Sequence, residues 1–87
     1  MLRIQRASNG KVVFTLSGRI EAEDVAELRR LLALEAPAAQ ILLDLGEVLL
    51  VERAGVEFLA ECEAAGITLD CCPAYVRMWI DQIKGKT

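Results

Sequence analysis

The stretch QILLDLGEVLLVERAGVEFLAECEAAG, residues 40–66, decides the fold, because it joins a strand pattern to a helix pattern. Residues 40–45 contain a short apolar run bounded by polar or turn residues. This pattern is typical of a strand covered on both faces, in a sheet with crossover connections. Small and apolar residues then recur at helical spacing: Gly55, Phe58, Leu59 and Cys62. They predict a helix over residues 55–65, and Gly66 is a natural stop for it.

Upstream of this stretch, the sequence predicts a β-hairpin. Residues 2–6 alternate their side chains, and residues 11–16 are rich in β-branched and aromatic residues. Between them, Asn9-Gly10 is the strongest short-range signal for a tight turn. Ser17-Gly18 then interrupts the second strand.

A helix is predicted over residues 21–36. It begins with carboxylates, which suit the positive end of the helix dipole, and it ends before Pro37. Leu34 points away from the apolar face, so it is either exposed or beyond the regular helix. That apolar face consists of Val25, Leu28, Leu31 and Leu32.

The last part of the chain predicts a short strand over residues 67–70 and a helix from Pro73 through Ile83. The inward side of this helix is expected to carry Val76, Ile80 and Ile83, with Trp79 at its edge. Two further side chains fall elsewhere and are expected to form an exposed contact patch: Tyr75 and Met78.

These elements predict an α/β fold of order β-β-α-β-α-β-α, with residues 1–87 as one domain. The expected architecture is a mixed four-stranded sheet with helices packed on it and right-handed crossovers between the parallel strands.

Charge and composition exclude several classes of function. The net charge is −3 and no basic cluster exceeds Arg29-Arg30, which disfavours nucleic acid as a partner. Histidine is absent, which removes Ser/His and Cys/His nucleophilic sites and nearly all imidazole metal sites. Neither a signal peptide nor a membrane-spanning run is present. A cytoplasmic protein that does not insert into the membrane is expected.

The reactive side chains can be interpreted in two ways. Cys62 and the adjacent pair Cys71-Cys72 could sense redox state or capture a soft metal, but their spacing matches no zinc site. We favour a structural role for the thiols. The carboxylates could form acid/base pairs, either Asp44 with Glu47 or Glu52 with Glu57. No polar cleft or substrate-binding group accompanies them, so we predict no catalytic residue, metal or cofactor. A Gly-rich phosphate loop is also missing from the sequence.

Three segments, VVFTLSGRI, AELRRLLA and ILLDLGEV, occur in an order that resembles the STAS domain family. That family includes bacterial anti-sigma factor antagonists and the cytoplasmic domains of sulfate transporters. The resemblance runs from Lys11 to Lys84, and its most telling points are Gly18, residues 43–45 (Leu-Asp-Leu) and Gly55.

The resemblance implies a switch that this chain lacks. Family members typically read Asp-Ser-Ser-Gly where this sequence reads Glu52-Arg53-Ala54-Gly55. In the antagonists the second serine accepts a phosphate from a kinase-type anti-sigma factor. Ala54 stands at that position and has no hydroxyl to modify. Family members also usually continue into another strand and helix, whereas this chain ends first.

The resemblance implies a non-catalytic regulatory module that binds protein, namely an anti-sigma factor or a similar kinase-like regulator. An accessory subunit of an ABC-type lipid transporter is the alternative, and a homodimer stays open. The partner surface is expected on the loop of residues 46–52 and the helix start at residues 53–58. Its expected residues are Gly46, Glu47, Glu52, Arg53, Ala54, Gly55, Glu57 and Phe58.

Overall fold

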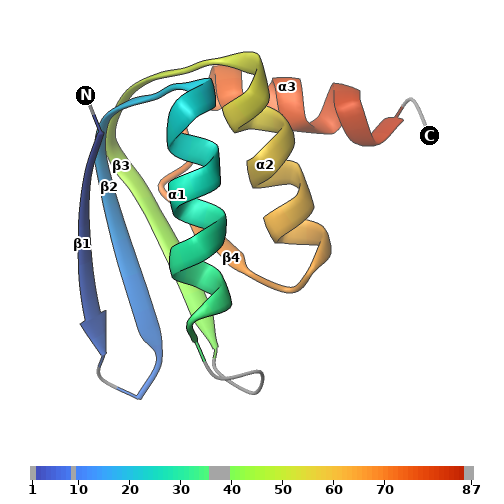
Figure 1. Cartoon of the computed structure of the whole chain (residues 1–87). Helices are drawn as coiled ribbons and strands as arrows, with labels where there is room; N and C mark the ends of the chain where they lie inside the picture. Colours follow the sequence, from blue (N-terminus) through green and yellow to red (C-terminus); the bar gives the residue numbers. More distant parts are fainter. Residues whose placement is uncertain (1, 9, 36–39, 86–87) are drawn as a thin grey trace.

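The computed structural model describes residues 2–8, 10–35 and 40–85. The predicted α/β class and the predicted order of elements are confirmed (Figure 1). The elements are β1 (Leu2–Ser8), β2 (Val12–Ile20), α1 (Ala22–Ala33), β3 (Ile41–Val51), α2 (Arg53–Ala64), β4 (Thr68–Asp70) and α3 (Ala74–Gly85).

The four strands form one mixed sheet in the order β1-β2-β3-β4. β1 pairs antiparallel with β2, as the predicted hairpin requires, and β2, β3 and β4 run parallel to one another. Asn9 of the predicted turn lies outside the described residues, while Gly10 has a φ of 83°, a conformation that favours glycine. α1 and α2 are the crossover connections between the parallel strands.

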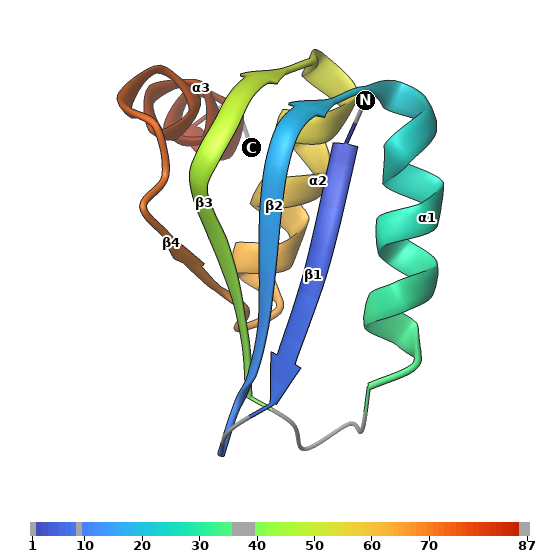
Figure 2. The same cartoon turned by 90° about the vertical axis from the view of Figure 1, so that its left-hand side faces the viewer.

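The helices cover only one face of this sheet. In Figure 2 the helices lie behind or beside the strands, and no helix lies in front of the strands. Burial along β2 alternates accordingly: Val12, Phe14 and Leu16 are buried, whereas Val13 is only half-buried. The expectation that β3 is covered on both faces is therefore wrong.

The core lies between the sheet and the helices and is entirely apolar. No polar or charged residue among the described residues is buried. Sixteen buried side chains from both strands and helices form this core: Val12, Phe14, Leu16, Ile20, Leu28, Leu43, Leu45, Val48, Val51, Val56, Phe58, Leu59, Ala60, Cys62, Val76 and Ile80. Burial of each larger side chain contributes about 1.5–3 kcal/mol, so this one cluster is the main source of stability.

β2 and β3 extend further than the sequence predicts. β2 continues through Gly18 to Ile20, and β3 continues past Leu45 to Val51. Gly18 adopts a φ of 95°, and the pairing register shifts on either side of it. Each shift places one extra residue in β3, so both strands bend without ending. The predicted loop at residues 46–52 is consequently wrong, because residues 46–51 belong to β3.

α1 begins with a reciprocal cap. The Glu21 side chain accepts from the backbone of Asp24, and the Asp24 carboxylate accepts from the Glu21 N–H at 2.8 Å. Such a capping box satisfies two of the N–H groups that a helix start leaves without a partner. The helix ends at Ala33, and Leu34 is its exposed C-cap. Pro37, the predicted stop, lies outside the described residues.

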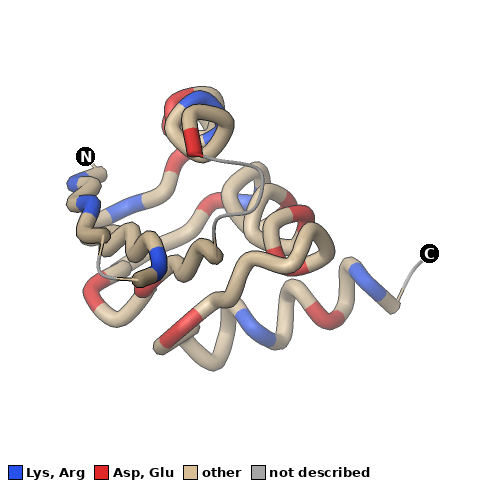
Figure 3. The backbone as a smooth tube through the Cα atoms, turned by 90° about the horizontal axis from the view of Figure 1, so that it is seen from below, with Lys and Arg blue, Asp and Glu red and all other residues tan. Residues whose placement is uncertain are grey.

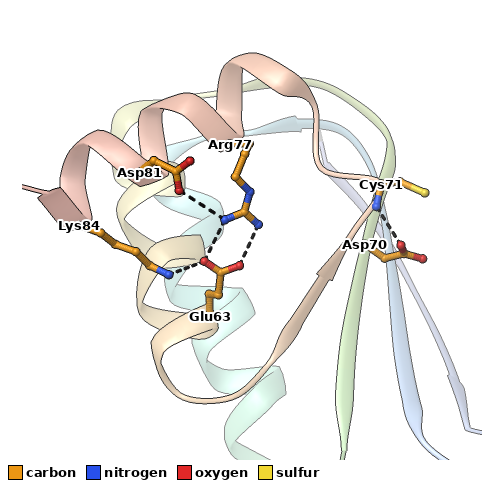
Figure 4. A network of polar contacts seen from close by, with 6 residues as sticks. All are labelled: Glu63, Asp70, Cys71, Arg77, Asp81 and Lys84. Atoms are coloured by element: carbon orange, nitrogen blue, oxygen red, sulfur yellow. Dashed lines mark hydrogen bonds and ion pairs between the residues drawn. The ribbon is translucent and has the colours of Figure 1, made fainter.

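α3 packs on the core through Val76 and Ile80, as its sequence pattern predicts. Trp79 and Ile83 contact the core from the edge. An ionic cluster then joins α3 to α2, shown in Figure 4. Its centre is Glu63 of α2.

Glu63 receives two hydrogen bonds from the Arg77 guanidinium, at 2.8 and 2.9 Å, and another from Lys84. These bonds, that of Arg77 first, lower the pKa of Glu63 to about 2. Asp81 lies 3.8 Å from Arg77 on the same helix. The cluster orients α3 across the end of α2.

Candidate functional site

The junction between β3 and α2 depends on a close contact at Gly55. A Cβ atom at this position would lie only 2.8 Å from Cγ2 of Ile20 and 2.8 Å from Cγ1 of Val51. Real Cβ contacts are essentially never this short. The absence of a side chain therefore lets the first turn of α2 lie against the ends of β2 and β3, and Gly55 is fully buried.

Glu52 is the N-cap of α2, but its side chain serves α1. Its Oε1 accepts a hydrogen bond from the backbone N–H of Ala22 at 2.9 Å. Its own N–H donates to the carbonyl of Ile20, also at 2.9 Å. The Glu52 side chain makes no capping hydrogen bond to the first turn of α2. The first N–H groups of α2 therefore have no side chain from the N-cap to accept their hydrogen bonds.

Arg53, Ala54 and Glu57 form the accessible start of α2. The Arg53 side chain is 78% exposed and its Nε lies 3.4 Å from Oε2 of Glu57, a weak contact one turn along the helix. Ala54 is half-buried. A methyl group at Ala54 has no hydroxyl, so it cannot accept a phosphate.

Two residues of the predicted surface lie in the core instead. Phe58 is 2% exposed and Gly55 is buried, so neither offers a side chain to a partner. The Arg29 guanidinium covers the Phe58 ring from 5.2 Å and donates to Glu61 at 2.9 Å. Helical spacing places Phe58 and Gly55 on the inward face, which is the signal that excludes them from a contact surface.

Gly46 and Glu47 are exposed but lie apart from the start of α2. The remainder of β3, residues 47–51, separates Glu47 from Glu52 by about 15 Å at the usual rise of a strand. Asp44 binds the backbone that follows it: its Oδ1 accepts a hydrogen bond from the Gly46 N–H at 3.0 Å. The structure therefore divides the predicted site into two separate areas.

The three thiols lie in different environments. Cys62 is buried, and burial raises its pKa to about 12. Cys72 is half-buried and its pKa is raised by burial as well. Cys71 is exposed, and its pKa is raised chiefly by the charge of Asp70, with that of Asp44 adding to it. A raised pKa reduces the thiolate fraction, so none of the three is activated as a nucleophile. Within the ranges that the structure describes, no group of acidic and Cys residues could hold a metal ion.

The expected contact patch on α3 is exposed and extends to β3. Tyr75 is 45% and Met78 63% exposed. The Tyr75 hydroxyl donates to the carbonyl of Leu49 at 3.4 Å, and Leu49 itself is 77% exposed. Sequence reasoning missed Leu49 because the register shift in β3 turns it outward.

An open groove of about 400 Å³ separates α1 from α2. Its charged groups, Arg29 and Glu61, already bind each other, so no free polar group converges on it. The groove is lined by Arg29, Leu32, Ala33, Phe58, Glu61, Cys62, Ala65 and Ile67. It is a shallow groove between two packed helices and lacks the convergent polar groups of an active site.

Comparison with known proteins identifies the fold. The sequence matches no protein-family model and no curated protein. Its structure is similar to that of an anti-sigma-factor antagonist STAS domain from Rhodobacter sphaeroides, with a TM-score of 0.62. The similarity covers 80% of this chain and 86% of that one, at 9% sequence identity. The chain therefore has a STAS-like fold. None of its described helices is long and apolar enough to cross a membrane.

Proposed function

We propose that this protein is a non-catalytic regulatory module that binds another protein through the start of α2, as anti-sigma factor antagonists do. The STAS-like fold supports the general kind of function. The observation that carries the proposal is the N-terminus of α2, which is accessible and has no side-chain cap. We place the protein in the cytoplasm, where kinase-like regulators of this type act.

The geometry at Glu52 determines what the partner supplies. Because the Glu52 carboxylate binds the N–H of Ala22, the first turn of α2 is left to an acceptor from outside. A helix N-terminus binds carboxylates and other anions well, through its N–H groups and its dipole. The partner therefore offers an acidic or carbonyl group to this turn. Arg53 lies beside this turn, and its positive charge also favours a negatively charged group on the partner.

Glu52, Glu57 and Glu61 bring three carboxylates to α2 and its N-cap, but this does not make the surface strongly acidic. Glu57 contacts Arg53 and Glu61 binds Arg29, so arginines neutralise two of the three. Glu52 already has a backbone partner. A strongly basic groove on the partner is consequently not required.

Ala54 makes this surface permanently available. A phosphoserine at such a position adds about −1.5 to −2 charge and changes the interface. A methyl group cannot be modified in this way, so the binding state does not depend on a kinase. Peptide mass mapping after incubation with a candidate kinase and ATP should find no phosphate between Glu47 and Glu61.

Affinity capture with matched variants tests the docking surface. Ala54→Asp places a charge in the first turn of α2, while Ala64→Asp makes the same chemical change at the exposed far end of the same helix. We expect a partner captured by the native protein to be lost with Ala54→Asp and kept with Ala64→Asp. Equal capture by both variants means that the start of α2 is not the docking site. The identity of the partner separates the alternatives: a kinase-like regulator supports the proposal, and an ABC transporter subunit replaces it with the accessory-subunit alternative.

A further inference from the structure

The uncovered face of the sheet carries side chains from all four strands. The pairing register places them in rows across the sheet, and their alternation with the buried core residues puts them on the opposite side. The rows are Arg19-Leu50, Arg3-Ser17-Glu47, Gln5-Thr15-Asp44-Asp70 and Ala7-Val13-Leu42-Thr68.

The apolar side chains of this face lie in its two end rows, while the two middle rows are polar. Val13 and Leu42 are half-buried neighbours on β2 and β3, and Leu50 is 45% exposed near the end of β3. β2, β3 and β4 are parallel strands, and parallel strands in proteins are normally covered on both faces. This sheet has a cover on one face only, so the other is suited to contact with a second surface.

The charges on this face are separated by sign, and within the described residues they form no ion pairs. Five of the seven arginines in the chain form ion pairs: Arg6, Arg29, Arg30, Arg53 and Arg77. The other two, Arg3 and Arg19, form none among residues 2–8, 10–35 and 40–85, and both lie on this face. They occupy β1 and β2, and the two charged residues of β1, Arg3 and Arg6, are both basic (Figure 3, segment beginning at N).

The acidic side chains of the face occupy the other two strands. Asp44 and Glu47 lie on β3, and Asp70 lies directly opposite Asp44 on β4. None of the three forms an ion pair within the described part of the chain. Like charges directly opposite each other destabilise a sheet unless a cation compensates them. Half of the face is therefore basic and the other half is acidic.

We infer that this face docks against the same face of a second copy of the chain. A two-fold axis parallel to the strands places β1 and β2 of one copy over β4 and β3 of the other. Arg19 then lies opposite Leu50 of the partner subunit, one row from Glu47 of the partner subunit, and Arg3 lies one row from Asp70 of the partner subunit. Adjacent rows are about 7 Å apart along the strands, which a long arginine side chain can span diagonally. Such an isologous contact is used twice, so each unpaired arginine gains a carboxylate. This use of Glu47 is separate from the docking surface at the start of α2.

The size of the face indicates a weak dimer. The strands have 7, 9, 11 and 3 residues. At about 3.3 Å per residue and about 4.8 Å between strands, they give roughly 450–500 Å² per copy. A standard stable interface contributes about 800 Å² from each partner. The dimer therefore depends on concentration and, because its contacts are partly ionic, on salt.

Sedimentation velocity with charge-exchange variants tests the inference. The first variant is Arg3→Glu with Arg19→Glu, and the second is Glu47→Lys with Asp70→Lys. A control with the same net charge as the first is Arg29→Glu with Arg30→Glu, both exposed on α1. Circular dichroism establishes that each variant is folded.

We expect the native protein to dimerise at low salt and to dissociate at about 0.5 M salt, where screening lies near 4 Å. Each face variant alone should dimerise roughly tenfold less well, a loss typical of unpaired interface charges. An equimolar mixture of the two should form a heterodimer, and the control should behave as the native protein. A native protein that stays monomeric at high concentration and low salt overturns the inference. A dimer that both face variants leave unchanged also overturns it.

Discussion

The carboxylate of Glu52, at the end of β3, accepts a hydrogen bond at 2.9 Å from the backbone N–H of Ala22, the first residue of α1. Thirty residues separate the two positions. The bond ties the starts of both crossover helices to the same end of the sheet. It also leaves α2 without a side-chain cap, which is the feature on which the proposed docking surface depends.

Removal of the Glu52 side chain should loosen this end of the fold. We expect Glu52→Ala to lower the free energy of unfolding by about 1 kcal/mol, the usual effect of losing a bond to a helix N-terminus. Urea denaturation followed by circular dichroism measures the change. Glu57→Ala is the control, because its single 3.4 Å contact is solvent-exposed and should contribute less than about 0.5 kcal/mol. Equal losses in the two variants contradict the role given to Glu52.

A methyl group at Gly55 should be costly. The two contacts of 2.8 Å, to Ile20 and Val51, force the start of α2 away from the sheet. We expect Gly55→Ala to destabilise the protein by about 1–3 kcal/mol, as overpacking of a core does. Gly85→Ala is the matched control at the end of α3, where a Cβ meets nothing within 4 Å. Its effect should be neutral or stabilising by up to about 1 kcal/mol, from helix propensity. Thermal midpoints of unfolding measure both effects, and a Gly55→Ala midpoint as high as that of Gly85→Ala contradicts the prediction.

Acid should weaken the attachment of α3. The pKa of Glu63 is about 2 in the folded protein, against an ordinary value of 4.5. A lowered folded-state pKa contributes stability above pH 4.5 and loses it as the pH falls toward 2. With allowance for solvent screening, we expect about 1–2 kcal/mol from this group at neutral pH.

The variant Glu63→Gln isolates that contribution. Its deficit relative to the native protein should be largest at neutral pH and should shrink between pH 4.5 and 2. Urea titrations at several pH values measure it. A deficit that stays constant over this range would falsify the assignment of the acid sensitivity to Glu63.

The thiols should react in an order set by their exposure. Near neutral pH, Cys71 should be alkylated first because it is the exposed one, although the charge of Asp70 raises its pKa and slows the reaction. Cys72 should follow more slowly, and Cys62 should react only on unfolding. Mass spectrometry of timed samples gives the order, with a urea-unfolded sample as the reference. Rapid labelling of Cys62 in the native protein contradicts its burial.

Much of the architecture is contained in local sequence patterns. The spacing of Val76 and Ile80 predicts the inward side of α3, and both side chains are fully buried. The same reasoning predicts that Tyr75 and Met78 are exposed, as they are. Periodicity of this kind suffices because the core is apolar throughout, so each helix needs only one apolar side.

The lengths of β2 and β3 could not be predicted from local sequence patterns. Gly18 and Gly46 read as interruptions in the sequence, yet β2 continues to Ile20 and β3 continues to Val51. Hydrogen bonds between the two strands hold these residues extended through two register shifts. Such pairing joins residues about thirty positions apart, so no local sequence pattern predicts it. The predicted loop at residues 46–52 became strand for this reason.

The sequence by itself determined the order of elements, the faces of the helices and the absence of a hydroxyl at Ala54. Only the tertiary structure decided which carboxylates form hydrogen bonds or ion pairs, and which face of the sheet is not covered by helices. Glu52 could have capped its own helix, but the fold brings the N–H of Ala22 within 2.9 Å. Arg3 and Arg19 form no ion pair with any described residue, because the helices, which carry most of the other charged side chains, pack on the opposite face. Hydrophobic periodicity acts within a few residues, whereas ion pairs and sheet cover depend on where distant segments meet.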